Sequence, residues 1–206
     1  MRTILRIFFH FLYHQLAFAY DLVAAVVSFG HWKNWISEVI PFVTGTQILE
    51  LGHGPGHLQR ILLSRNLFAI AIDESTQMGT LAKHNTRNSA RLTRGLAQHL
   101  PFANTSFDTI IATFPAEYIT DPHTLSEVTR CLHNGGRFIV LPVAMPRNRF
   151  LSWLFKITKQ APSEALEIVH KQFEEPFEQA DFKTESHLLD VKSGTLIVVV
   201  AKKKEK

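Results

Sequence analysis

The sequence predicts an α/β fold: a Rossmann-like, doubly wound sheet of seven strands, mostly parallel, with an antiparallel C-terminal hairpin and preceding N-terminal helices. Short apolar runs alternate with segments of helical periodicity, as is typical of parallel strands buried on both faces. Near the end, two strand-like segments flank Lys192-Ser193-Gly194, a composition that favours a hairpin turn. The strand signals are "TQILEL" at 46–51, "LFAIAID" at 67–73, "FDTIIATF" at 107–114, "RFIVLPVA" at 137–144 and the final "TLIVVVA".

Local signals place the elements between these strands. A helix is predicted at 122–133, because Asp121 is a suitable N-cap and Pro122 suits the first helical position. Gly135 and Gly136 provide its expected stop. The remaining elements, predicted from periodicity, are helices at 56–65 and 75–88 and a short strand at 90–96.

The N-terminal part differs in character from the rest. Residues 4–29 are unusually apolar and aromatic, and we expect residues 4–40 to be helical, with a break near Gly30 and an end at Pro41. A transmembrane span of about 20 apolar residues is disfavoured, because the stretch carries several polar and charged side chains. Two alternatives stay open: a helix buried against the domain, and a helix lying on the membrane surface or over a lipophilic pocket. The polar residues are Arg6, His10, His14, Gln15 and Asp21.

Composition restricts the class of protein. The 206 residues, of which 46% are hydrophobic and 19% charged, suit one well-buried domain, expected at 41–206 after N-terminal helices at 1–40. The single cysteine, Cys131, allows no disulfide within this sequence, so we expect a cytoplasmic location, with peripheral contact at the inner face of the membrane left open. The net charge of +4 owes much to the lysine-rich tail. The sequence shows no basic face with interleaved aromatics beyond it, so nucleic acid is not an expected partner.

The stretch "ILELGHGPGHLQ" at 48–59 forms a glycine-rich turn after the first strand of the sheet, where open α/β sheets bind ligands. It matches neither a dinucleotide fingerprint, whose third glycine would stand at position 57, nor a P-loop, which needs Gly-Lys-Ser/Thr. Glu50 disfavours a phosphate and would suit an ammonium group. Asp73 ends the second strand, where an acid can bond ribose hydroxyls. The residues therefore predict a nucleoside ligand.

Four motifs in this order resemble those of the class I S-adenosylmethionine-dependent methyltransferases: "LELGHGPG", "AIDES", "LPFANTSFDTIIATFP" and "LHNGGRFIVL". The third is similar to the stretch that leads into the fourth strand of the type 11 methyltransferases. The terminal hairpin resembles the family's antiparallel sixth and seventh strands. The resemblance covers about residues 45–201, and it implies a methyltransferase with S-adenosyl-L-methionine as cofactor.

The resemblance also implies a cofactor site. Glu50 would neighbour the methionine amino group, the turn glycines would let the backbone approach the methionine part, and Asp73 would hold the ribose. Many relatives carry an acid where this chain has Leu96, so the Ala97 backbone and the Gln98 side chain are the expected substitutes around adenine. The full set of expected cofactor contacts is Glu50, Gly52, His53, Gly54, Gly56, Asp73, Glu74, Ala97, Gln98, Thr113 and Phe114, with Ser75 next to Glu74.

Methyl transfer depends mainly on aligning the acceptor with the sulfonium group, so a catalytic base is not required. Three residues are candidates for acceptor contact or proton movement: Tyr118 and His123 beyond the fourth strand, and His53 in the turn. Each has an ordinary alternative as a loop residue oriented by packing. The histidines show no metal-ligand spacing, so no metal is expected.

The acceptor is predicted from what covers the site. The stretch 13–35 resembles the leading helices of quinone-ring C-methyltransferases and, more loosely, of bacterial phospholipid N-methyltransferases. A second apolar segment, "RNRFLSWLFKIT" at 147–158, is framed by basic residues and suits either an interface helix or an inward-packed lid. We therefore expect a lipophilic acceptor, a quinone-ring carbon or a lipid head-group amine, with peripheral membrane contact through 4–29 and 147–158. A soluble acceptor, or a non-catalytic cofactor-binding sensor or partner subunit, stays open; the sequence does not determine the oligomeric state.

Overall fold

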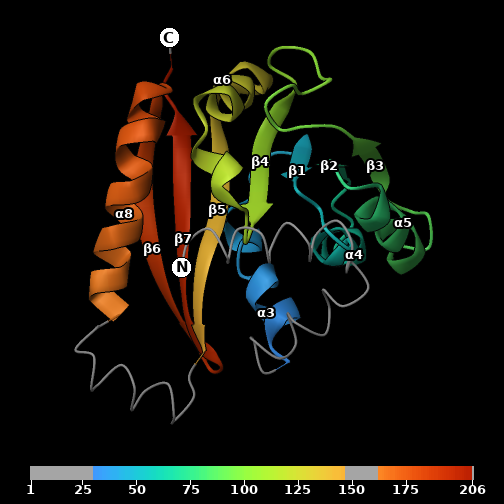
Figure 1. The fold of residues 1–206 in the computed structure, drawn as a ribbon, viewed down its shortest axis with the longest axis horizontal. Helices are drawn as coiled ribbons and strands as arrows, with labels where there is room; N and C mark the ends of the chain where they lie inside the picture. Colours follow the sequence, from blue (N-terminus) through green and yellow to red (C-terminus); the bar gives the residue numbers. More distant parts are fainter. Residues whose placement is uncertain (1–29, 147–161, 206) are drawn as a thin grey trace.

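The structure is a computed structural model that describes residues 30–146 and 162–205 of the chain. The predicted helices within 4–29 and the segment 147–158 lie outside the described residues. Seven strands form one sheet in the order β3-β2-β1-β4-β5-β7-β6 (Figure 1). Their bounds are β1 Ile48–Leu51, β2 Ala69–Asp73, β3 Arg91–Arg94, β4 Phe107–Thr113, β5 Leu132–Pro146, β6 Phe182–Val191 and β7 Gly194–Lys203.

The sheet confirms the predicted topology. Strands β1 to β5 pair in parallel, and β7 runs antiparallel between β5 and β6. The predicted hairpin turn is also correct, since Val191 pairs with Gly194 and only Lys192 and Ser193 separate the two strands. The strongly apolar β7 is buried because its alternate residues pack into the cores on the two faces of the sheet, whereas the edge strand β6 has alternating exposure.

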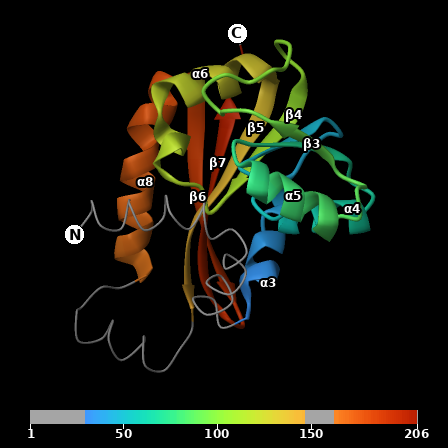
Figure 2. The same ribbon diagram turned by 45° about the vertical axis from the view of Figure 1, so that its right-hand side comes forward.

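Helices cover both faces of the sheet (Figures 1 and 2). One core joins α6 and α8 to the sheet through side chains such as Leu125, Val128 and Phe177, and the other joins α3 and α4 through Trp35 and Leu58. The bounds are α3 Trp32–Ser37, η2 Ile40–Phe42, α4 His57–Ser64, α5 Thr76–Asn85, η3 Glu117–Thr120, α6 Pro122–Cys131 and α8 Pro162–Gln179. No helix in these described parts of the chain is long and apolar enough to cross a membrane.

The start of α6 confirms the local prediction, but its end does not. The Asp121 carboxylate accepts the backbone N–H of His123 at 2.8 Å, as an N-cap should. The helix stops at Cys131, and Gly135 and Gly136 lie within β5, so their prediction as the helix stop was wrong. The physical reason is tertiary: a Cβ on Gly136 would lie 3.1 Å from the backbone carbonyl oxygen of Asp108 in the neighbouring strand β4, where the β4–β5 register shifts.

Two further departures concern helices. Pro41 was expected to end the N-terminal helical region, but α3 already ends at Ser37 and Pro41 lies inside η2. The helix α8 has no counterpart in the sequence-based prediction. Pro176 lies inside it, and proline is a residue that normally interrupts a helix.

Candidate cofactor and acceptor site

The candidate site lies at the carboxyl ends of β1, β2 and β4. Glu50 of β1 pairs with Ala71 of β2 and with Ile111 of β4, so the segments that follow these three parallel strands emerge at the same edge. The glycine-rich turn that follows β1 leads directly into α4. This edge next to the first strand is where open α/β sheets bind ligands.

The glycine turn is held by β2. The backbone N–H groups of Gly52 and His53 both donate to the carbonyl of Ile72, at 2.8 and 3.3 Å. Asp73 then completes the connection: its Oδ2 accepts the N–H of Gly54 at 2.9 Å, and its Oδ1 accepts the N–H of Ser75 at 2.8 Å. The predicted ribose-binding acid therefore also positions the turn, a function that the sequence did not reveal. Each carboxylate oxygen keeps a second lone pair for a ligand hydroxyl.

The three glycines of the turn have different surroundings. A Cβ on Gly54 would meet no atom within 4 Å, and the φ of +49° favours glycine there, so this position leaves space for a ligand to approach the backbone. A Cβ on Gly52 would lie 2.5 Å from the hydroxyl oxygen of Tyr118. A Cβ on Gly56 would lie 3.0 Å from Cβ of Ala82, so this glycine allows α4 and α5 to pack.

Glu50 is fully buried within β1, with only 1% of its surface exposed. Gln59 of α4, also buried, donates from Nε2 to Oε2 of Glu50 at 2.7 Å. Burial raises the pKa of Glu50 to about 8, the hydrogen bond from Gln59 opposes this shift, and the charge of Asp73 adds to it. A ligand ammonium group near Glu50 would favour the ionised carboxylate. Gln59 was not among the predicted site residues, and its place in the first turn of the helix that follows the glycine turn is the signal that could have suggested it.

His53 is 4% exposed, and its Nδ1 lies 2.7 Å from the carbonyl oxygen of Gly54. Because a carbonyl can only accept, Nδ1 carries the proton in this arrangement, and Nε2 of the neutral ring is an acceptor. His57, the first residue of α4, is also buried. The buried, oriented ring at His53 is thus compatible with proton acceptance.

The expected adenine side lies next to Asp73. Asp73 pairs with Arg94, and the N–H of Gly95 donates to the carbonyl of Asp73 at 3.1 Å. The segment 95–98 therefore starts beside Asp73 and Glu74, as the resemblance implies. Leu96 is 45% exposed, while Ala97 and Gln98 are half-buried. The roles of Ala97 and Gln98 in binding adenine stay predictions.

The predicted acceptor side lies beyond β4. Phe114 directly follows the half-buried Thr113, and its ring stacks on that of Trp32, with centroids 4.1 Å apart and an interplanar angle of 28°. Tyr118 lies in η3, with its hydroxyl against Gly52. His123 is exposed in the first turn of α6. Trp32 was not a predicted site residue.

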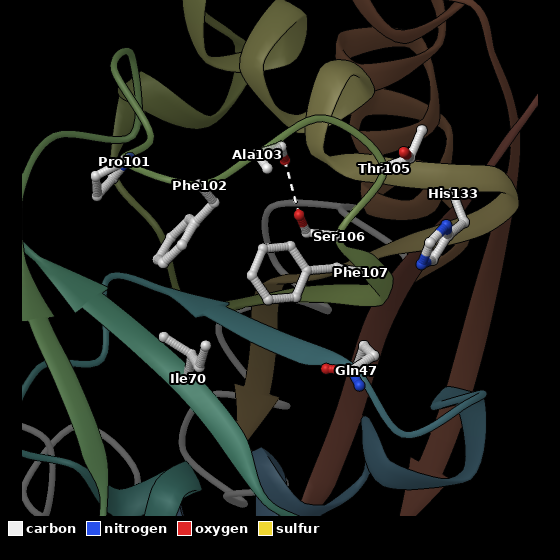
Figure 3. Close-up of a pocket in the computed structure, with 9 residues that line it drawn as sticks. All are labelled: Gln47, Ile70, Pro101, Phe102, Ala103, Thr105, Ser106, Phe107 and His133. Atoms are coloured by element: carbon white, nitrogen blue, oxygen red, sulfur yellow. Dashed lines mark hydrogen bonds between the residues drawn. The ribbon is translucent and has the colours of Figure 1, made fainter.

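A pocket of about 520 Å³ lies at the opposite edge of the sheet (Figure 3). Its position follows from the chain: Gln47 precedes β1, Ile70 lies near the start of β2, and Phe107 begins β4. It is therefore separate from the glycine turn. The other lining residues are Pro101, Phe102, Ala103, Thr105, Ser106 and His133. In residues 30–146 and 162–205, no group of three or more His, Cys, Asp or Glu side chains is arranged to hold a metal.

Fold and site together define a class: a doubly wound α/β protein with a nucleoside-type site at the carboxyl edge of its sheet. Residues 49–140 match the family described as methyltransferase domain. The demethylmenaquinone methyltransferase of Thermobifida fusca is 30% identical over 159 residues, which cover 71% of this chain and 67% of that protein. The enzyme of the same name from Symbiobacterium thermophilum is 30% identical over 156 residues, covering 70% of this chain and 62% of that protein.

Among solved structures, phosphoethanolamine N-methyltransferase 2 of Haemonchus contortus, in complex with S-adenosyl-L-methionine, has a TM-score of 0.64 at 17% identity; the match covers 96% of this chain and 60% of that chain. The chain belongs to the S-adenosylmethionine-dependent methyltransferases. S-adenosylmethionine is the cofactor of this family, and the open approach at Gly54, together with Asp73 and Glu50, fits it. The chain spans 62% and 63% of the length of two of its curated relatives, so the acceptor in a relative's name is that relative's own.

Proposed function

We propose that this protein transfers a methyl group from S-adenosylmethionine to a ring carbon of a lipophilic quinol. The observation that carries the proposal is the glycine turn pinned by Asp73, with open space at Gly54, in a chain 30% identical to demethylmenaquinone methyltransferases. The cofactor, when bound, supplies an electrophilic methyl group on a sulfonium. The protein then has to hold this group and the acceptor in line, which can account for much of the rate enhancement.

The cofactor-binding roles follow from the surroundings of the residues. Gly54 gives the backbone room for the methionine part, and Asp73 offers its remaining lone pairs to the ribose hydroxyls. Glu50 compensates the amino group from within the core, and Gln59 holds its carboxyl in place. Gly52, Ala97 and the other predicted contacts keep the roles that the resemblance implies.

Methylation of a ring carbon forms one carbon–carbon bond and replaces one ring hydrogen, so a proton must leave the acceptor. We assign proton acceptance to Nε2 of His53, because the Gly54 carbonyl holds the Nδ1 proton and the ring is buried. Tyr118 is the second candidate for contact with the acceptor, since its hydroxyl lies against Gly52. His123 is the third candidate. Because its side chain is exposed, its contact with the acceptor depends on the direction from which the acceptor enters.

The experiment uses cofactor labelled in its methyl group. Transfer would be measured to a short-chain demethylmenaquinol, to phosphatidylethanolamine vesicles, to a pool of soluble amines, and in a reaction without acceptor. We expect label in the quinol fraction, and its loss in Asp73→Ala. Label in the lipid amine or the soluble pool alone would contradict the quinol assignment. Cofactor binding without label in any acceptor would favour a sensor or partner subunit.

We also propose peripheral membrane contact through 4–29 and 147–158, both outside the described residues. This proposal rests on their apolar and basic composition. Deleting residues 1–20 should reduce binding to anionic vesicles, or activity on the lipophilic acceptor, more than it reduces cofactor affinity. Equal losses of all three would instead mean that the segment belongs to the core.

A further inference from the structure

We propose that Trp32 and Phe114 form an aromatic platform on which a flat, uncharged ring of the methyl acceptor stacks. The proposal rests on the proposed function, because it names the acceptor side of the same site and the chemical class that it takes. A platform of this kind would take a ring compound as the acceptor, and it would not suit a small amine.

The pair lies beside the glycine turn. Phe114 follows the last residue of β4, and β4 pairs in parallel with β1, so Phe114 and Gly52 lie at the same edge of the sheet. Tyr118, further along the segment after β4, brings its hydroxyl against Gly52. Figure 1 shows α3, which carries Trp32, beyond the tip of β4. An acceptor on this pair would therefore approach the turn from the side of α3.

Trp32 projects from a firmly anchored helix. Trp35 in the same helix is 1% exposed, and its Nε1–H donates to Oγ of Ser193 in the β6–β7 turn at 2.8 Å. Ile36 and Val39 are also buried in the core between α3, α4 and the sheet. A binding side chain held on such a rigid base is positioned more accurately than one on a loop.

Phe114 has an unusual backbone. Its φ is +49°, in the left-handed region where a bulky residue is rare and costs energy. The conformation is held by its own N–H, which donates to the carbonyl of Leu141 at 2.7 Å. Glycine or asparagine would adopt this backbone more easily, so a phenylalanine here is best explained by a use for its ring. Stacking on Trp32 directs that ring toward α3.

The geometry favours a flat neutral ring over an ammonium group. Cations are usually held by ring faces directed at a common point or by a carboxylate. Here the two rings are stacked at 28°, and both are half-buried. The nearest candidate acid for a cation, Glu50 of β1, is 1% exposed and hydrogen-bonded to Gln59. A quinol or naphthol-type ring would extend this stack, since aromatic rings stack with an offset at such spacings.

The first test compares Trp32→Leu with Trp32→Phe and with the control Phe102→Leu, using short-chain demethylmenaquinol as acceptor. We expect Trp32→Leu to raise the acceptor KM about 5- to 10-fold, with kcat and cofactor Kd changed by less than about 2-fold. Trp32→Phe should keep most of the affinity. The control should leave the acceptor KM unchanged, because Phe102 packs on Phe107 at the opposite edge of the sheet.

The second test needs no turnover. A Trp35→Phe/Trp153→Phe variant keeps Trp32 as its only tryptophan, since the chain has three. Menadione, a flat naphthoquinone whose oxidised ring is not a nucleophile for the methyl group, should quench Trp32 fluorescence with saturation in the absence of cofactor. Phe114→Asn, whose side chain tolerates a left-handed backbone, should weaken this binding while thermal stability is kept.

The outcomes separate the two proposals. Methylated quinol with an unchanged acceptor KM in Trp32→Leu would overturn the platform and leave the proposed function in place. Saturable menadione quenching without methyl transfer to any quinol would support the platform and overturn the proposed function. Quenching that rises linearly without saturation, or a parallel rise of cofactor Kd in Trp32→Leu, would also overturn the platform.

Discussion

The Asp73 carboxylate at the end of β2 accepts the backbone N–H of Gly54 at 2.9 Å, across 19 positions of sequence. The same side chain accepts the N–H of Ser75, which begins the next helix as its N-cap. One residue thus joins the turn after β1 to the segment after β2. This relationship means that a change at Asp73 acts on the shape of the site as well as on ligand contact.

The first prediction concerns Asp73→Ala. Loss of hydrogen bonds to a charged group, at about 1.5–3 kcal/mol each, should weaken cofactor binding by about 10-fold or more. The matched control is Asp108→Ala, because Asp108 accepts the N–H groups of Thr46 and Gln47 before β1, away from the site. Calorimetry should show the cofactor effect for Asp73 alone, while both variants lose thermal stability. Unchanged cofactor affinity in Asp73→Ala would refute the placement of the cofactor.

The second prediction is a pH dependence set by Glu50, whose folded-state pKa is raised from 4.5 to about 8, chiefly by burial. Because the folded state holds this proton more tightly than the unfolded state, the contribution to stability is complete below pH 4.5 and is lost as the pH rises through 8. Glu50→Gln keeps the side-chain shape and removes the titration. Thermal unfolding of the ligand-free variant should therefore depend less on pH than that of the wild type. If the melting temperatures of both proteins changed equally with pH, the raised pKa of Glu50 would be contradicted.

Glu50 also links protons to cofactor binding. If the cofactor amino group lies near this carboxyl, binding favours the ionised form and releases a proton near neutral pH. Calorimetry in buffers of different ionisation enthalpy should detect the release in the wild type and a smaller release in Glu50→Gln. Identical proton release would place the amino group elsewhere.

The third prediction concerns Gly52 and Tyr118. Gly52→Ala places a methyl group 2.5 Å from the Tyr118 hydroxyl and strains a backbone with a φ of +68°. The variant should therefore have a lower free energy of unfolding and a weaker affinity for the cofactor. Adding Tyr118→Phe should restore part of the lost stability, because it removes the clash but leaves the strain of about 1–2 kcal/mol. Gly54→Ala is the comparison, since its methyl group would meet no protein atom within 4 Å. If Tyr118→Phe gives no rescue in thermal unfolding, the contact is not the cause.

The fourth prediction concerns stability far from the site. The ammonium of Lys203, a 9% exposed residue, donates to the carbonyls of Thr129 and Leu132 at the end of α6, at 2.7 Å each. Lys203→Met leaves both acceptors without this donor, so the free energy of unfolding should fall by about 1–3 kcal/mol. Lys202→Met is the control, because the Lys202 side chain is 55% exposed. Equal losses of unfolding free energy in the two variants, measured by denaturant unfolding, would refute the stabilising role of the Lys203 hydrogen bonds at the end of α6.

Sequence reasoning succeeded where the signal is local. Asp121 and Pro122 correctly predicted the start of α6, because capping depends on neighbouring residues. Apolar runs correctly predicted the buried strands, because this pattern also lies in neighbouring residues. The predicted end of α6 was wrong, since Gly135 and Gly136 lie within β5, where Gly136 allows close packing beside β4. Such a contact between strands leaves no local mark.

The site residues also divide into those that a local motif predicts and those that depend on tertiary contacts. The glycine turn, Asp73 and Glu50 follow from a contiguous motif and its spacing. Gln59 and Trp32 were missed, because their importance lies in contacts: Gln59 with Glu50, and Trp32 with Phe114. The different surroundings of Gly54 and Gly56 were likewise invisible, although both are glycines of one motif.

By itself, the sequence determined the class of fold, the order of the strands along the chain and the edge at which a nucleoside is expected to bind, because periodicity and turn chemistry are encoded in neighbouring residues. The tertiary structure alone decided that Asp73 pins the turn, that burial raises the pKa of Glu50, and that Trp32 lies on Phe114. These properties arise from desolvation and from contacts between distant segments, which exist only once the sheet has brought its edges together.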